Sequence, residues 1–88
     1  MTSKYNTKDR ETINLFIVAT KGVLDNFRAL TILMSLVAEY NGIKDRFSED
    51  IAQIINEAKN INSDDTKEVT LSKIQKMNDS LKKLDSES

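Results

Sequence analysis

The chain has 88 residues, 13 basic and 14 acidic side chains, a formal net charge of −1, no cysteine and no histidine. Because the positive and negative charges nearly cancel, the chain has no field of a single sign that would attract nucleic acid or an anionic membrane. Without histidine and cysteine, the usual general base, the thiol nucleophile and the commonest transition-metal ligands are missing, so we expect a non-enzymatic protein with no cofactor and no metal site.

The absence of proline and the presence of only two glycines favour an all-α fold, because these residues do most damage inside helices. A domain of this size buries only about 60–65% of its unfolded surface, so association would add stability. We predict a small bundle of three helices in a single domain over 8–84. A flexible tail at 1–7, with Thr7 as N-cap of the first helix, and a frayed C-terminus at 85–88 complete the expected organisation.

The first predicted helix covers residues 8–40 and contains an apolar stretch at 12–40, here called the spine. Asn41 and Gly42 are expected to end it in the left-handed conformation. A straight helix of this length would measure roughly 50 Å, against about 30 Å for a compact chain of this size. Either Gly22 divides the helix, or the molecule is elongated and completed by oligomerisation. We favour one long helix, because apolar packing can override the roughly 1 kcal/mol cost of an interior glycine.

A narrow polar stripe runs along the spine, and nearly all residues of the spine outside this stripe are apolar. The stripe recurs at helical spacing and consists of Asn14, Lys21, Asp25, Arg28, Ser35 and Glu39. An ordinary surface helix is apolar over little more than a third of its circumference, so the spine is expected to have neighbours on several sides. One chain is not expected to supply all of that cover. The sequence therefore predicts a homo-oligomer that completes the bundle.

The partner-binding residues predicted from the spine are a charged cluster and the apolar residues beside it. They are Lys21, Asp25, Arg28, Phe27, Leu30 and Met34. In the simpler interpretation, the three charged residues form exposed ion pairs at i,i+4 and i,i+3, each stabilising by about 0.2–0.5 kcal/mol. In the functional interpretation, the cluster sets the register of a partner helix, or Arg28 recognises an acidic group on a partner.

Two amphipathic helices are predicted after the spine. Residues 43–60 carry apolar side chains at steps of three or four with one adjacent pair, and the short connection before them favours an antiparallel hairpin with the first helix. These apolar residues are Ile43, Phe47, Ile51, Ile54, Ile55 and Ala58. A polar break follows, and Asp65 and Glu68 have the spacing of a capping box for a third helix over about 66–84. The apolar seam of this third helix is Leu71, Ile74, Met77, Leu81 and Leu84.

The positions of the charged residues also bear on whether the chain spans a membrane or carries a secretory signal. Lys21, Asp25 and Arg28 interrupt the spine, so no span of about 20 apolar residues remains to cross a bilayer. A basic N-terminus before a short apolar run suggests a secretory signal, but Asp9 and Glu11 count against it. Because cysteine, a signal and a membrane span are all absent, we expect a cytoplasmic protein.

Three functions fit these patterns. The first is a homo-oligomeric module for protein–protein contact, of an assembly or regulatory kind, with coiled-coil-like packing. The second is a monomeric adaptor, inhibitor or immunity-type protein that lays an apolar helix face on a different macromolecule. The third is nucleic-acid binding by a helical oligomer, with Lys73, Lys76 and Lys83 as phosphate contacts. Asp79 lies among these lysines and no aromatic residue is near them to stack on a base, so the sequence favours a protein partner.

Overall fold

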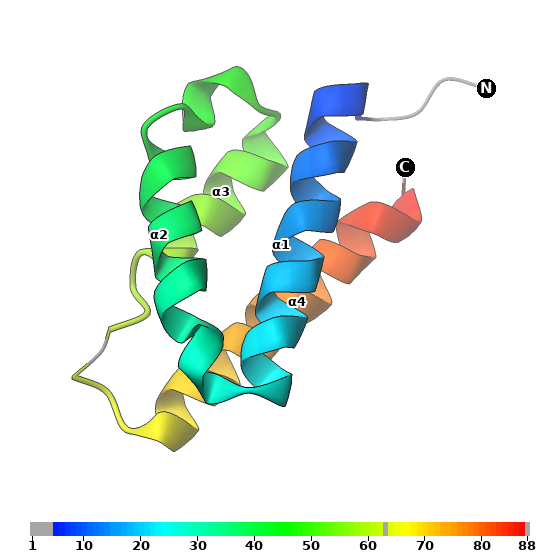
Figure 1. The fold of residues 1–88 in the computed structure, drawn as a ribbon. Helices are drawn as coiled ribbons and strands as arrows, with labels where there is room; N and C mark the ends of the chain where they lie inside the picture. Colours follow the sequence, from blue (N-terminus) through cyan, green and yellow to red (C-terminus); the bar gives the residue numbers. More distant parts are fainter. Residues whose placement is uncertain (1–4, 63, 88) are drawn as a thin grey trace.

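The computed structural model describes residues 5–62 and 64–87, and all regular structure within them is helical (Figure 1). This part of the chain holds four α-helices: α1 (Thr7–Asp25), α2 (Leu30–Asn41), α3 (Glu49–Ala58) and α4 (Lys67–Glu87). Two short 3-10 helices, η1 (Phe27–Ala29) and η2 (Lys44–Arg46), connect α1 to α2 and α2 to α3. The all-α prediction is confirmed, but four α-helices replace the predicted three.

The four α-helices run alternately in opposite directions, so each is roughly antiparallel to the next (Figure 1). Contacts join α1 to α2, α2 to α3 and α3 to α4, and the most extensive packing joins α1 to α4. The helices therefore form a closed ring of neighbours around one core. The radius of gyration is 12.6 Å, close to the value of about 12 Å expected for a compact chain of this length.

The predicted single helix over 8–40 is wrong, because the chain leaves the helix at Asn26. This residue is extended, with φ −147° and ψ 104°. Its side-chain oxygen accepts a hydrogen bond from the backbone N–H of Arg28 at 3.1 Å, at the start of η1. Asparagine side chains compete with the helix in this way by bonding to nearby backbone groups. The two halves of the spine fold back as α1 and α2, and each covers part of the other.

Gly22, the residue considered as a breaker, lies inside α1 without interrupting it. Replacing Gly22 by alanine is expected to raise the free energy of unfolding by about 0.5–1 kcal/mol, because alanine restricts the unfolded chain and favours the helix. The added methyl group would meet no atom within 4 Å outside its own helical turn. Urea denaturation at low protein concentration measures the change. Gly42→Ala is the control at a helix end, and a less stable Gly22→Ala variant would contradict the open space at residue 22.

The N-cap of α1 is Asn6 and not the predicted Thr7, so the helix starts one residue earlier. The Oδ1 atom of Asn6 accepts a hydrogen bond from the backbone N–H of Asp9 at 2.8 Å. A further hydrogen bond joins the backbone N–H of Arg10 to the carbonyl oxygen of Asn6 at 3.0 Å. Asparagine is among the best N-cap residues because its short side chain reaches these unpaired donors.

Two long-range hydrogen bonds join Tyr5 and Asp9 to the N-terminal end of α3. The predicted tail included Tyr5, but this residue is buried, and its hydroxyl donates to the carboxylate of Asp50 at 2.8 Å. The buried carboxylate of Asp9 accepts a hydrogen bond from the backbone N–H of Ser48 at 3.3 Å. The tail prediction is therefore corrected for its last three residues, while residues 1–4 lie outside the described part.

Residues 43–60 form two helices instead of the predicted one, because Phe47 turns into the core between η2 and α3. Phe47 is extended, with φ −109° and ψ 168°. Its ring stacks on Tyr40 at a centroid distance of 5.8 Å, and Tyr40 meets Phe16 edge-on at 5.2 Å. The predicted antiparallel hairpin is made by α2 and α3 (Figure 1). The expected left-handed turn is absent, since Gly42 has φ −67° and no described residue has a positive φ.

The predicted third helix over 66–84 corresponds to α4, and its cap differs from the expected one. The hydroxyl oxygen of Thr66 accepts a hydrogen bond from the backbone N–H of Val69 at 3.2 Å. Asp65, the expected cap, instead pairs with the ammonium group of Lys73 at 2.8 Å. This ion pair joins the polar connection between α3 and α4 to the second turn of α4.

The C-terminal end of α4 and its apolar seam can be compared directly with the prediction. Residues 85–87, expected to be frayed, continue the helix to Glu87, and Ser88 lies outside the described residues. Of the five seam residues, Ile74, Met77 and Leu81 are buried, and Leu71 and Leu84 are partly buried against the core.

The core contains one polar contact that joins α1 to α4. Asn78 donates from Nδ2 to the hydroxyl oxygen of Thr20 at 2.8 Å and to the carbonyl oxygen of Ile17 at 3.3 Å. Asn78 and Thr20 are both buried. A buried amide left without these partners would cost about 1–3 kcal/mol, so the contact favours one register of α1 against α4. The largest fully buried side chains around it are Phe16, Ile13, Leu33, Ile51, Ile55, Ile74 and Leu81.

Candidate interaction surfaces

The first candidate surface is a stripe of α1 that none of the other helices buries, here called the outer stripe. Its members recur at steps of three and four residues and are Lys8, Glu11, Leu15, Val18, Gly22 and Asp25. Val18 is 69% exposed and Leu15 is 36% exposed. Ile13 and Val23, five residues to either side of Val18, are fully buried. Five residues turn a helix by about 140°, so the Val18 side chain points away from the core.

The predicted charged cluster is only partly brought together. The ammonium group of Lys21 lies 3.3 Å from the carboxylate of Asp25, and both side chains are well exposed. Such a pair contributes little to stability. Arg28 lies beyond the break, exposed in η1, and the described residues show no ion pair between Asp25 and Arg28. The predicted i,i+3 pair does not form because the helix ends between its two members.

The predicted apolar partner residues lie on the other side of the break. Phe27 is half-buried, and the ammonium group of Lys67 lies 5.5 Å from its ring centroid. Leu30 and Met34, also half-buried, line an open groove of about 820 Å³ between α2 and the segment 59–62. No residue of α1 lines this groove. The structure therefore assigns the predicted site residues to separate surfaces.

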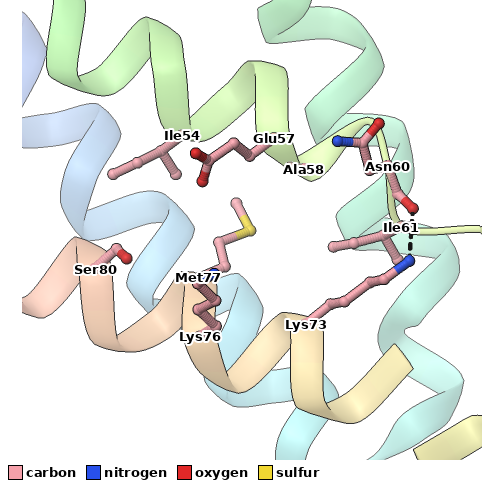
Figure 2. Close-up of a pocket in the computed structure, with 9 residues that line it drawn as sticks. All are labelled: Ile54, Glu57, Ala58, Asn60, Ile61, Lys73, Lys76, Met77 and Ser80. Carbon is pink, nitrogen blue, oxygen red and sulfur yellow. Dashed lines mark hydrogen bonds between the residues drawn. The ribbon is translucent and has the colours of Figure 1, made fainter. Parts of the chain in front are cut away.

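A smaller hollow of about 330 Å³ lies between α3 and α4 (Figure 2). Figure 2 shows the Met77 side chain and the Glu57 carboxylate pointing into the same space. Lys73 extends to the rim, where its ammonium group donates to the carbonyl oxygen of Asn60 at 3.0 Å. The volume is at the lower end of small-molecule sites. Its lining residues are Ile54, Glu57, Ala58, Asn60, Ile61, Lys73, Lys76, Met77 and Ser80.

The three lysines of α4 predicted to contact phosphate lie beside acidic residues. Lys73 is bonded to Asp65 and to the backbone of Asn60. Lys76 lines the hollow between α3 and α4, and Lys83 lines a shallow hollow that adjoins it and shares Glu57 with it. The acidic residues that share this shallow hollow are Asp50, Glu57 and Glu87. The pairing of Lys73 and the acidic neighbours of Lys83 give no support for a phosphate-binding role of these lysines.

The outer stripe was not selected from the sequence, although a signal for it was present. A single spine helix covered on several sides predicts that Leu15 and Val18 belong to its apolar face. Val18 nevertheless lies four residues after Asn14 and three before Lys21, which places it on the polar stripe. An apolar residue among exposed polar ones was the available sign of a contact surface.

The described residues offer neither a metal site nor a membrane span. Residues 5–62 and 64–87 contain no group of three or more acidic side chains close enough to hold a metal ion. None of the helices in this part of the chain is both long and apolar enough to span a bilayer. In comparisons with known proteins, no family model, no curated protein and no solved structure matches the chain.

Proposed function

We propose that this protein is a non-enzymatic helical module for protein–protein contact that self-associates through the outer stripe of α1. The observation that carries the proposal is the 69% exposure of Val18 at the middle of this stripe. Fully burying an exposed valine or leucine contributes about 1.5–3 kcal/mol. Gly22 adds to the argument, because the space beside it is filled by no other part of the chain and a second backbone can approach there.

The fold changes the physical reason for association. The break at Asn26 lets α1 and α2 fold against each other and against α3 and α4, so most large apolar side chains of the spine are buried or partly buried within one chain. Among the described residues, the large apolar side chains that remain exposed are Leu15, Val18, Ile32 and Val69. We therefore propose a folded monomer in equilibrium with an oligomer, and not a chain that needs a partner in order to fold.

Replacing Val18 by glutamate is expected to abolish self-association, because the interface would have to bury an unpaired charge. Molar mass is measured by light scattering over a concentration series. The molar mass of the wild type is expected to rise above the monomer value of 10.0 kDa as the protein concentration increases, whereas that of the Val18→Glu variant is expected to stay at the monomer value.

Val69→Glu is the matched control, since Val69 is 44% exposed but lies on α4. This variant is expected to associate like the wild type. A wild type that remains monomeric at every concentration would show that self-association is wrong. Equal loss of association in both variants would show that the outer stripe is not the contact surface.

The groove beside Leu30 and Met34 favours a second candidate function, that of a monomeric adaptor. A groove with an apolar wall on α2 suits the apolar face of a helix from a different protein. This function requires no contact between copies of the chain. The same concentration series separates the two candidates, because an adaptor predicts a monomer for the wild type and for both variants.

A further inference from the structure

The order of charges along the outer stripe restricts which partner helix can lie on it. From N- to C-terminus the stripe carries a cation at Lys8, an anion at Glu11, the apolar pair Leu15 and Val18, then Gly22 and finally an anion at Asp25. Its steps of three, four, three, four and three residues are those of one seam of a coiled coil. The apolar pair is at the centre, and charges of opposite sign occupy the two ends.

We propose that the occupant of the outer stripe is α1 of a second copy, running antiparallel in a two-fold dimer, an inference that rests on the proposed function. An antiparallel pair centred between Leu15 and Val18 places Leu15 of each copy opposite Val18 of the other. The same register places Lys8 opposite Asp25, and Glu11 opposite Gly22. Each pairing occurs twice, because a two-fold axis relates the copies.

The charges exclude the parallel alternative. A parallel pair in register would set Lys8 against Lys8, Glu11 against Glu11 and Asp25 against Asp25. Like charges at such short range oppose association, whereas the antiparallel register joins a cation to an anion at both ends. The charge order therefore selects one orientation.

The contacts within each chain are compatible with this pairing. The ion pair between Lys21 and Asp25 is well exposed, so either group can exchange its partner at small cost. The ammonium group of Lys8 lies 5.8 Å from the ring centroid of Phe47, and Lys8 remains exposed in that position. The open space beside Gly22 leaves room for the Glu11 side chain of the second copy.

The size of the surface sets the strength of the dimer. The 19 residues of α1 measure about 28 Å along the helix axis. Two helices of this length bury less than the roughly 1,600 Å² of a standard protein interface. The dimer is therefore weak and forms as concentration rises. It does not grow further, because a two-fold contact uses the same surface of both copies and is closed.

Cysteine cross-linking tests the orientation, since the chain has no cysteine of its own. The variants E11C and G22C are oxidised separately and as an equal mixture, at concentrations where light scattering shows a wild-type dimer. The antiparallel register brings residue 11 of one copy next to residue 22 of the other. The mixture is expected to give severalfold more covalent dimer than either variant alone.

A charge exchange provides the second readout. Lys8→Asp and Asp25→Lys are each expected to weaken the dimer, and the double variant is expected to restore it because opposite charges again face each other. Cross-linking of E11C with itself as efficient as in the mixture would overturn the antiparallel orientation while self-association still holds. A wild-type dimer with neither mixed cross-linking nor charge rescue would also overturn it. A wild type that remains monomeric at every concentration would contradict the proposed self-association as well as the orientation of the dimer.

Discussion

Replacing Phe16 by alanine is expected to lower the free energy of unfolding by about 3–5 kcal/mol, the usual cost of deleting a buried aromatic ring. Phe16 is fully buried on α1, and its ring meets Tyr40 of α2 edge-on at a centroid distance of 5.2 Å. The deletion leaves a cavity where the two halves of the spine cover each other. A chain of this length has a total stability on the order of 4–13 kcal/mol, so much of it would be lost. Urea denaturation followed by circular dichroism measures the change.

The control for this variant is Ile32→Ala, which also truncates a large apolar side chain of the spine. Ile32 is 65% exposed, so its replacement is expected to change stability by no more than about 0.5 kcal/mol. If Phe16→Ala lowered the free energy of unfolding no more than Ile32→Ala does, the result would contradict the packing of α1 against α2.

The second large effect is expected from Asn78→Asp, which should lower stability at neutral pH by about 3–5 kcal/mol, the scale for an uncompensated buried charge. Asn78 donates to the hydroxyl oxygen of Thr20 and to the carbonyl oxygen of Ile17. An ionised carboxylate of the same shape has no donor and would place negative charge against both oxygens.

The pH dependence of this variant gives a sharper test than its stability at one pH. Burial raises the pKa of the introduced carboxyl above its value in the unfolded chain. The folded state accommodates the introduced aspartate only in its protonated, neutral form. The free energy of unfolding of the variant is therefore closest to that of the wild type below the pKa of this carboxyl in the unfolded chain. It falls as the pH rises through the higher pKa of the same carboxyl in the folded state. The stability difference from wild type must therefore widen from acid to neutral pH. Asn56→Asp, at an exposed position near Lys44, is the control, and a difference independent of pH in Asn78→Asp would contradict the buried contact.

The helical class and most of the apolar faces could be predicted because they depend on composition and local period. The prediction misplaces the break in the spine, because it considers only Gly22 as the breaker. A glycine costs a helix about 1 kcal/mol and offers the chain no alternative structure. Asn26 does offer one, since its side chain bonds to the backbone two residues later. Asp25 and Asn26 together were the local signal for the turn.

The break before α3 depends largely on tertiary contacts, although Ser48 followed by Glu49 and Asp50 is a local signal for a helix start. Phe47 stacks on Tyr40, and the backbone of Ser48 is held by Asp9 from the start of the chain. The groove beside Met34 has the same origin, because it lies between α2 and a connection that only the tertiary fold brings alongside. The outer stripe differs, since the position of Val18 among polar residues is readable from helical period alone.

The packing of α1 on α4 has a consequence for how the protein folds. This is the most extensive interface in the molecule, and it joins the first α-helix to the last, with Asn78 contacting Ile17 across 61 residues of sequence. Interfaces between distant segments form slowly, because the entropy of closing the intervening loop is lost before the contacts are gained. During synthesis from the N-terminus, α1, α2 and α3 are complete before α4 exists. We therefore expect the nascent chain to hold an uncovered apolar flank on α1 until α4 has been made.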